Sequence, residues 1–138
     1  MAAKTVVIDA SVASKWFLLE PDRPAARSVQ RDHDLIAPEL IIAEVMNAIW
    51  KNVRQSRVDP IQVPLIADAL PRSFSRLWPL LPLLPRAVEI SLALDHPIYD
   101  AFYIALAEQE GVNLVTADER LWRKTRRTPY AGRLRKLG

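Results

Sequence analysis

The chain has 138 residues, half of them hydrophobic and a quarter charged, with three glycines and a net charge of +3. This length and composition suit one globular domain that can bury a core without disulfides or a structural metal, and they exclude a disordered chain. The sequence contains no cysteine, which excludes disulfides, thiolate nucleophiles, zinc–thiolate sites and iron–sulfur clusters. The first residues resemble no signal segment, and no apolar stretch is long enough to span a bilayer. We therefore expect a single domain over residues 1–138, cytoplasmic and not bound to a membrane.

Strand-like and helical runs alternate along the chain. "TVVID" (residues 5–9), "DLIAP" (34–38) and "VNLVTA" (112–117) are short runs of strand character. Helical patterns cover residues 10–20, 22–32, 38–56, 59–69, 85–94, a segment that opens at Ile98, and 119–126. Because strands separated by helices pair in parallel, this order predicts an α/β fold with a parallel sheet covered on both faces.

The segment "LWPLLPLLP" (residues 77–85) allows two interpretations. Its three prolines at every third position match a polyproline ligand for an SH3-like domain. Its leucines, however, are too apolar for an exposed linker. We favour a short strand near Leu80 and Leu81 that leads into the helix over residues 85–94.

The basic residues are concentrated near the C-terminus. Residues 120–138 carry eight Lys or Arg and no acid, so residues 1–119 hold 11 basic and 16 acidic groups, a net charge of −5. A basic terminal segment often meets a polyanion, although a solvated helix face with a frayed end would have the same composition.

Two aspartates follow strand-like runs. Asp9 ends the first run and Asp118 comes just after the last one. In open α/β sheets ligands bind at the carboxyl ends of the strands, so both acids are placed at the edge where sites form. Either can instead be a helix N-cap, and Thr116 with Glu119 can form a capping box around Asp118.

Two further acids lie in apolar surroundings. Glu44 shares a helix face with Leu40, Ile41 and Ala48, so we expect it to be partly buried unless it extends to the edge of that face. Asp100, in the first turn of an apolar helix, can cap that helix or lie in a partly dry pocket.

The four acids can converge on one pocket. Carboxylates placed together repel, and a bound cation can hold them ionised. Oxygen ligands without sulfur or an adjacent histidine indicate a hard ion, Mg²⁺ or Mn²⁺. His33 and His96 fall in predicted loops, where we expect a surface or loop role for both, and Ser11 has no nearby histidine to make it a nucleophile.

The stretches "VVIDASV", "APELIIAEVMNAIWK", "YDAFYIALAEQEG" and "LVTADERL" resemble the successive motifs of PIN-domain ribonucleases. The resemblance is strongest to the VapC-type toxins of bacterial and archaeal toxin–antitoxin operons, and it spans Val6 to about Trp122. It implies a PIN-like three-layer sandwich, in which helices flank a short central parallel sheet.

The resemblance also implies an activity: an Mg²⁺- or Mn²⁺-dependent endoribonuclease that acts as a toxin and leaves a 5′-phosphate and a 3′-hydroxyl. The catalytic and metal-binding acids it implies are Asp9, Glu44, Asp100 and Asp118. The residues it places near the metal ligands are Ser11, Asn47 and Thr116.

Three partners follow from the resemblance and the charge. RNA is the implied substrate, and the basic residues after Asp118 that we expect to bind it are Arg120, Arg123, Lys124, Arg126 and Arg127. A homodimer and a small antitoxin, whose C-terminal segment packs on the toxin, are the implied protein partners. The apolar side chains that can receive that segment are Trp16, Phe17, Ile49, Trp50 and Val53, although core packing is the expectation for most of them.

Three other classes of protein are alternatives to this assignment. A catalytically silent PIN-like module that binds nucleic acid or protein is the main alternative. A phosphoacceptor receiver domain needs an acid pair at its first strand, where "VVID" has one acid. A haloacid-dehalogenase phosphatase needs two aspartates separated by one residue, and "DAS" lacks the second.

Overall fold

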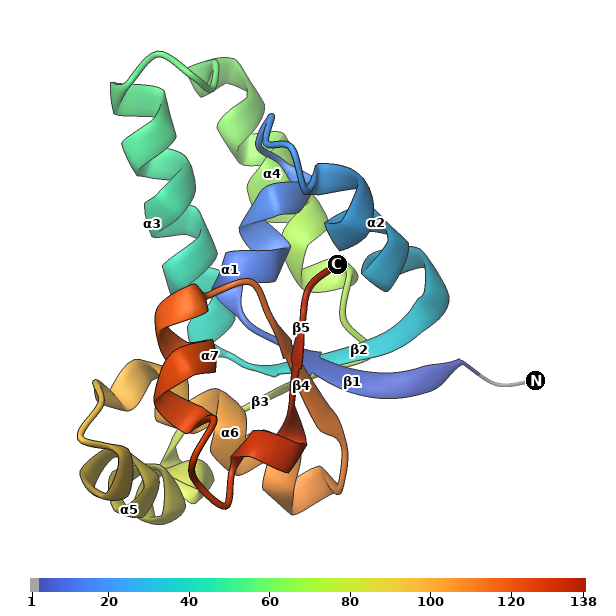
Figure 1. The fold of residues 1–138 in the computed structure, drawn as a ribbon. Coiled ribbons are helices and arrows are strands. Elements are labelled where there is room, and N and C mark those ends of the chain that lie inside the picture. Colours follow the sequence, from blue (N-terminus) through green and yellow to red (C-terminus); the bar gives the residue numbers. More distant parts are fainter. Residues whose placement is uncertain (1–2) are drawn as a thin grey trace.

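A parallel five-stranded sheet forms the centre of the protein in a computed structural model that describes residues 3–138 (Figure 1). The strands are β1 (Lys4–Ile8), β2 (His33–Pro38), β3 (Arg76–Trp78), β4 (Asn113–Thr116) and β5 (Leu134–Lys136). Their order in the sheet is β3-β2-β1-β4-β5, and every neighbouring pair is parallel. In the central strand, Val7 is in register with Ile36 of β2 and Leu114 of β4.

Helices cover both faces of this sheet. They are α1 (Ala10–Ala13), α2 (Arg23–Asp32), α3 (Leu40–Arg54), α4 (Val63–Arg72), α5 (Leu84–Leu94), α6 (Ile98–Glu110) and α7 (Glu119–Thr125). Helices α1 to α4 lie on one face and α5 and α6 on the other (Figure 1). The predicted three-layer α/β sandwich is therefore confirmed.

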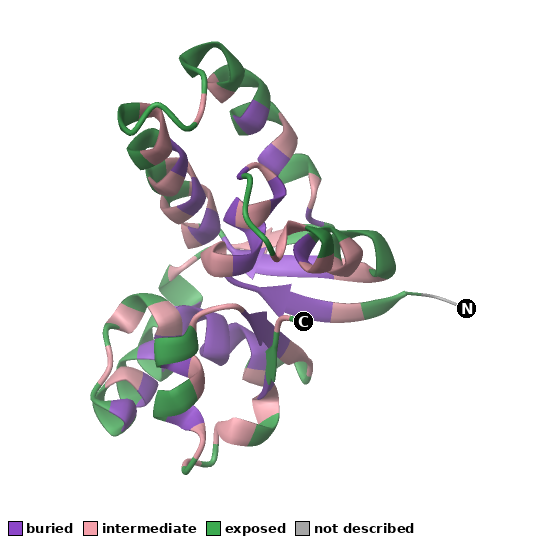
Figure 2. Ribbon diagram, turned by 45° about the horizontal axis from the view of Figure 1, so that its top comes forward, coloured by how far each residue is buried: buried purple, intermediate pink, exposed green. Residues whose placement is uncertain are grey.

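The core lies between the sheet and the inward sides of the helices, where Figure 2 shows the buried residues gathered. Helix α6 packs against β1, β2 and β4, and each of its residues 101–107 is buried, which explains its apolar sequence. Helix α3 buries only Ile41, Val45 and Ile49, whose spacing of four residues is typical of a helix with one face on the core. No helix within residues 3–138 has both the length and the hydropathy to cross a bilayer.

The predicted strand near Leu80 and Leu81 is wrong. The strand is β3, three residues earlier, and residues 81–83 form a short 3₁₀ helix instead. Pro79 and Pro82 have no N–H to donate to a sheet, whereas Arg76–Trp78 lie beside β2 and the Trp78 carbonyl accepts from the Glu39 N–H at 2.8 Å.

The first predicted helix is shorter than residues 10–20. Helix α1 ends at Ala13, a 3₁₀ turn continues to Trp16, and the chain then turns at Phe17. Lys15 fixes the turn through ion pairs with Glu20 (2.5 Å) and Asp22 (3.2 Å). Leu18, which follows this turn, is 7% exposed and belongs to the core.

Candidate active site

Asp9 is a buried aspartate at the point where β1 passes into α1. It is 4% exposed and is the N-cap of α1, with Oδ1 accepting from the Val12 N–H at 3.3 Å. Ser11 Oγ donates to Oδ1 and Thr116 Oγ1 donates to Oδ2, each at 2.5 Å. Burial raises the pKa of Asp9 to about 7, although these donors oppose the shift and the negative charge of Asp100 adds to it.

Ser11 and Thr116 join the ends of the two central strands. Their hydroxyl oxygens lie 3.4 Å apart, and both also accept from the turn after β4. The Ala117 N–H donates to Ser11 Oγ at 2.9 Å, and the Asp118 N–H donates to Thr116 Oγ1 at 3.1 Å. The two hydroxyls therefore hold the Asp9 carboxylate and the Asp118 backbone in one network.

Asp118 caps α7. Its Oδ1 accepts from the N–H groups of Arg120 (2.9 Å) and Leu121 (3.2 Å). Asp9 and Asp118 are thus both helix N-caps, as the sequence allowed, and both lie at the carboxyl edge of the sheet. The capping box with Glu119 does not form, because the Glu119 carboxylate binds Lys136.

Glu44 is half-buried on α3, as predicted. Its Oε1 accepts from the Tyr103 hydroxyl of α6 at 2.6 Å. Burial raises the pKa of Glu44, the Tyr103 hydroxyl opposes the shift, and the charge of Asp100 adds to it. Asn47 is exposed one turn further along α3, and its side chain makes no hydrogen bond within the described residues.

Asp100 lies in the first turn of α6 and is bound by a histidine. His96 Nε2 is 2.5 Å from Asp100 Oδ2, and the His96 side chain is 6% exposed. Burial raises the pKa of Asp100, His96 and Arg120 oppose the shift, and the charge of Asp118 adds to it. His96 lies in the loop between α5 and α6, as predicted, but the expected surface role is wrong, because the imidazole is buried against a site acid. His96 precedes α6, which begins at Ile98, so the helical rule for residues four apart does not predict this contact.

His33 takes no part in this cluster. It begins β2, and its Nδ1 lies 3.2 Å from the Val29 carbonyl at the end of α2.

The four acids have few cations near them: the charges of His96 and Arg120 act on Asp100. The negative charge of Asp100 raises the pKa of Asp9 and of Glu44, and the charge of Asp118 raises the pKa of Asp100, so Asp100 is the acid that the other three share as a neighbour. Within residues 3–138, no Lys or Arg forms an ion pair with any of the four. Partly dry carboxylates that repel one another fit a hard divalent cation by their donor chemistry. In that same part of the chain, no group of three His, Asp or Glu side chains is already arranged to hold an ion.

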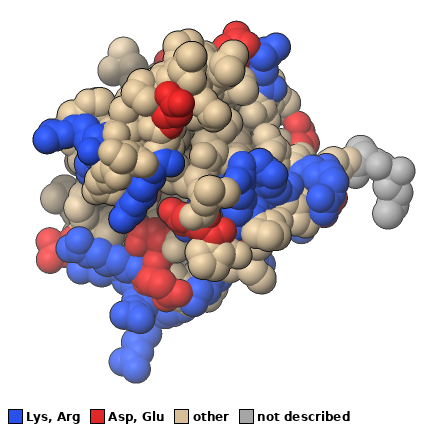
Figure 3. Space-filling view, turned by 90° about the horizontal axis from the view of Figure 1, so that it is seen from above, with Lys and Arg blue, Asp and Glu red and all other residues tan. Residues whose placement is uncertain are grey.

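The basic residues after Asp118 divide into two sets. Four of them are exposed: Arg120, Arg123, Lys124 and Arg127. Arg126 is instead fixed in the fold: its guanidinium stacks on the Trp122 ring at 3.3 Å, its Nε donates to the Trp122 carbonyl at 3.0 Å, and its Nη2 donates to the Ala131 carbonyl at 3.2 Å. On the face in Figure 3, Lys and Arg side chains border acidic ones.

The C-terminal residues are ordered beside β4. Leu134 is 1% exposed in β5, and the Leu137 N–H donates to the Thr116 carbonyl at 2.8 Å. The frayed end considered for this segment is therefore wrong, because strand pairing and the burial of Leu134 hold it in place.

The parallel sheet between helical layers, with carboxylates at its carboxyl edge, agrees with the PIN-like sandwich that the sequence predicts. The model of the PIN domain family matches residues 6–127, so the chain belongs to that family.

Its relatives include ribonucleases of the VapC type. The chain is 36% identical over 117 residues to Ribonuclease VapC12 of Mycobacterium tuberculosis, covering 84% of this chain and 88% of the relative. It is 30% identical over 122 residues to Ribonuclease VapC3 of Pyrobaculum aerophilum, covering 86% and 93%.

Two solved structures have a similar fold. PAE2754 from Pyrobaculum aerophilum matches with a TM-score of 0.65 and 28% identity over 93% of this chain and 90% of that chain. VapC20 of Mycobacterium tuberculosis, described as a toxin that cleaves the sarcin–ricin loop, matches with a TM-score of 0.65 over 83% of this chain and 90% of that chain. At 15% identity, VapC20 is evidence for the fold alone.

Proposed function

We propose that this chain is a metal-dependent endoribonuclease, the toxin of a toxin–antitoxin pair, which hydrolyses RNA phosphodiesters at the cluster of four acids. The observation that carries the proposal is Asp9: a buried carboxylate with three donors, no basic partner among residues 3–138, and a second acid close enough to raise its pKa. Membership of the PIN-domain family and the ribonuclease relatives support the same conclusion.

The residues proposed to hold Mg²⁺ or Mn²⁺ are Asp9, Glu44, Asp100 and Asp118. The ion would neutralise charge that develops on the scissile phosphate and lower the pKa of a bound water. The chain's own part is to keep these carboxylates aimed at one place. Hydrogen bonds from Ser11 and Thr116 orient Asp9, and two backbone N–H groups orient Asp118. The implied role of Asn47 beside the metal has no supporting contact in the structure.

The proposal is tested by cleavage of a mixed RNA substrate with purified protein in Mg²⁺ or Mn²⁺. We expect cleavage that is lost on adding EDTA and in Asp100→Asn. Asp68→Asn is the matched control, because Asp68 is an exposed acid of α4 paired only with Arg72, and it should cleave like the wild type. RNA binding without cleavage in either metal would instead support the silent PIN-like module.

We expect the exposed arginines to bind the RNA backbone, because an acidic pocket repels phosphates. Arg127→Ala should weaken RNA binding and reduce the slope of log affinity against log salt by about one. Arg126→Ala should lower the melting temperature and leave that slope unchanged, because its guanidinium is bound to Trp122 and Ala131. Filter binding across a salt series measures the two slopes, and thermal unfolding measures the melting temperature. Equal slopes for the two variants would contradict the assignment.

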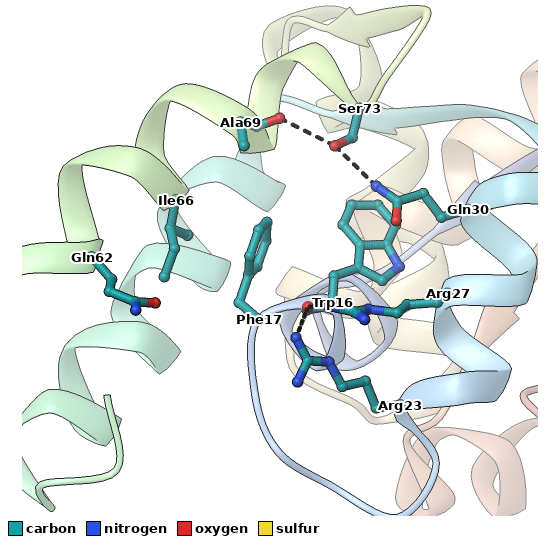
Figure 4. A pocket seen from close by; sticks show the side chains of 9 residues that line it. All are labelled: Trp16, Phe17, Arg23, Arg27, Gln30, Gln62, Ile66, Ala69 and Ser73. Atoms are coloured by element: carbon teal, nitrogen blue, oxygen red, sulfur yellow. Dashed lines mark hydrogen bonds between the residues drawn. The ribbon is translucent and has the colours of Figure 1, made fainter. Parts of the chain in front are cut away.

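A pocket between α2, α4 and the 3₁₀ turn that follows α1 is the surface we propose for the antitoxin (Figure 4). Its volume is about 410 Å³, and no acidic residue lines it. Figure 4 shows the Phe17 ring between Ile66 and Trp16, with Arg23 and Arg27 beside them. This mixture suits a peptide that carries an apolar residue next to a carboxylate.

The apolar residues expected to receive the antitoxin differ in exposure. Trp16 and Ile49 are buried at 3% and 0%, as core packing predicts, whereas Trp50 is 52% exposed; Phe17 and Val53 are intermediate. Replacing Arg23 and Arg27 together by alanine should weaken binding of the antitoxin peptide in calorimetry. Unchanged affinity would move the antitoxin site elsewhere.

An apolar stripe along α5 and the 3₁₀ turn before it supports the proposed homodimer. Leu81, Leu84, Val88 and Leu92 are 77%, 38%, 39% and 77% exposed, and their spacing places them along one side. Light scattering should report a dimer for the wild type and a monomer for Leu92→Asp.

A further inference from the structure

Glu44 on α3 is joined to α6 by the hydroxyl of Tyr103, 59 residues further along the chain. We propose that Tyr103 is a positioning residue, whose hydroxyl holds the Glu44 carboxylate in the orientation in which it binds the divalent cation. The inference rests on the proposed function, since it assumes that the four acids bind that cation. The sequence motif points to Asp100 on this helix, and neither motif nor family match assigned a role to Tyr103.

The Tyr103–Glu44 hydrogen bond is short, and it is the one hydrogen bond that the Glu44 carboxylate accepts from the described residues. Tyr103 Oη lies 2.6 Å from Glu44 Oε1, and Oε2 accepts no hydrogen bond from the described residues. One oxygen of the carboxylate is therefore held by the protein while the other remains able to bind a cation. No other side chain within residues 3–138 donates to Glu44, so loss of the Tyr103 hydroxyl leaves this half-buried acid without a donor.

The hydroxyl is also a fixed donor. Tyr103 is 1% exposed, in the middle of the fully buried run 101–107, so packing restricts its ring to one orientation. A tyrosine hydroxyl carries its proton at neutral pH, since its ordinary pKa is about 10. It can therefore donate a hydrogen bond without adding a negative charge to the cluster.

Helix geometry connects this donor to a second acid. Asp100 and Tyr103 are three residues apart and share a face of α6. One helix thus supplies a carboxylate directly and orients a second carboxylate on α3. A displacement of α3 relative to α6 would change the separation of Glu44 from Asp100, and the Tyr103 hydrogen bond opposes that displacement.

The purely structural alternative is that the hydrogen bond only ties α3 to α6. It predicts that Tyr103→Phe lowers the melting temperature and leaves cation binding unchanged. A positioning role predicts weaker cation binding in a protein that is still folded. The two differ in a quantity that can be measured without RNA.

The experiment titrates metal-free protein with Mn²⁺ by calorimetry and compares wild type with Tyr103→Phe, which keeps the ring and removes only the hydroxyl. We expect the variant to bind Mn²⁺ about 10-fold to 100-fold more weakly. In RNA cleavage, kcat should fall while KM for RNA is unchanged. Tyr130→Phe, on a tyrosine beside Arg86 and outside the cluster, is the matched control and should behave as wild type.

A double variant completes the test. In a Glu44→Gln background, Tyr103→Phe should cause no further loss of Mn²⁺ affinity, because the group it orients has been changed. Equal Mn²⁺ affinity for wild type and Tyr103→Phe would overturn the inference while leaving the nuclease proposal intact. Weaker Mn²⁺ binding by Tyr103→Phe, in a protein that cleaves no RNA in wild-type form, would support the inference and overturn the nuclease. A wild type that binds neither Mn²⁺ nor Mg²⁺ would overturn both.

Discussion

Asp9 has two structural requirements that conflict when no cation is bound. As the N-cap of α1 and the acceptor for two hydroxyls, it is best placed as a carboxylate. As a residue only 4% exposed and near Asp100, it is best placed as a neutral acid. Burial is the larger effect, which is why its pKa rises to about 7.

This conflict predicts how the stability of metal-free protein depends on pH. The folded-state pKa of Asp9 lies above the ordinary value of 3.8, so its contribution is fully present below about pH 4 and is lost as the pH rises through about 7. The free energy of unfolding should therefore fall over that range, by about 4 kcal/mol at most from Asp9. Asp100 and Glu44, whose pKa values are also raised, act in the same direction.

Urea unfolding between pH 4.5 and 7.5, with EDTA present, measures this dependence. Asp9→Asn is the informative variant, because it removes the charge and keeps the shape. Its free energy of unfolding should fall less steeply with pH than that of the wild type. Parallel curves for the two proteins would show that Asp9 titrates normally.

Among the elements, the long buried runs were predictable from the sequence and the short edge strands were not. β1, β2 and β4 are apolar because helices cover both faces, and α3 and α6 have clear patterns. β3 and β5 have three residues each and lie at the sheet edges, where neighbours rather than composition decide strand formation. The first helix is shorter than its sequence predicts, because ion pairs of Lys15 turn the chain before Pro21.

The acids of the site were predictable from the sequence, but not all of the residues that orient them. Strand ends locate Asp9 and Asp118, because the carboxyl ends of parallel strands meet at one edge. An acid on an apolar helix face indicates Glu44. Of the groups that orient these acids, the sequence predicted Ser11 and Thr116 but not Tyr103 or His96. Tyr103 resembles any core aromatic of α6 and His96 resembles a loop residue, until the packing of the helices places each beside an acid.

β5 provides a prediction at the element scale. Leu134→Ala should lower the free energy of unfolding by roughly 2–4 kcal/mol. The Leu134 side chain is 1% exposed, so truncating it leaves a cavity beside β4. Arg135→Ala, on the exposed residue next to it, should have little effect. Equal urea midpoints for Leu134→Ala and wild type would mean that β5 is not part of the cooperative unit.

Over the whole molecule, charge is segregated: an acidic body of net charge −5 is joined to a basic segment. In the fold that segment includes α7 and β5, which lie beside β4 at the acidic edge, so attraction of RNA and repulsion by carboxylates act close together. A divalent cation that reduces the repulsion should therefore stabilise the folded state as a whole.

The corresponding measurement is thermal unfolding with added Mn²⁺. At a free concentration of 100 times the dissociation constant, the gain in stability should be about 2.7 kcal/mol. The gain should shrink toward pH 5, where protons compete for Asp9, and should be smaller in Asp100→Asn at the same concentration. An equal rise in melting temperature for wild type and Asp100→Asn would place the bound Mn²⁺ elsewhere.

The hydrogen bond from Thr116 to Asp9 joins residues 107 positions apart, and it forms only when β1 and β4 have paired. Contacts of such long sequence separation carry a large loop-closure cost and tend to form late. A chain that has already built α3, α4 and the β1–β2 pair still has Asp9 without its Thr116 donor and without Asp118 beside it. We therefore expect the nuclease site to assemble late in folding, so that a partly folded copy of this proposed toxin would leave RNA intact.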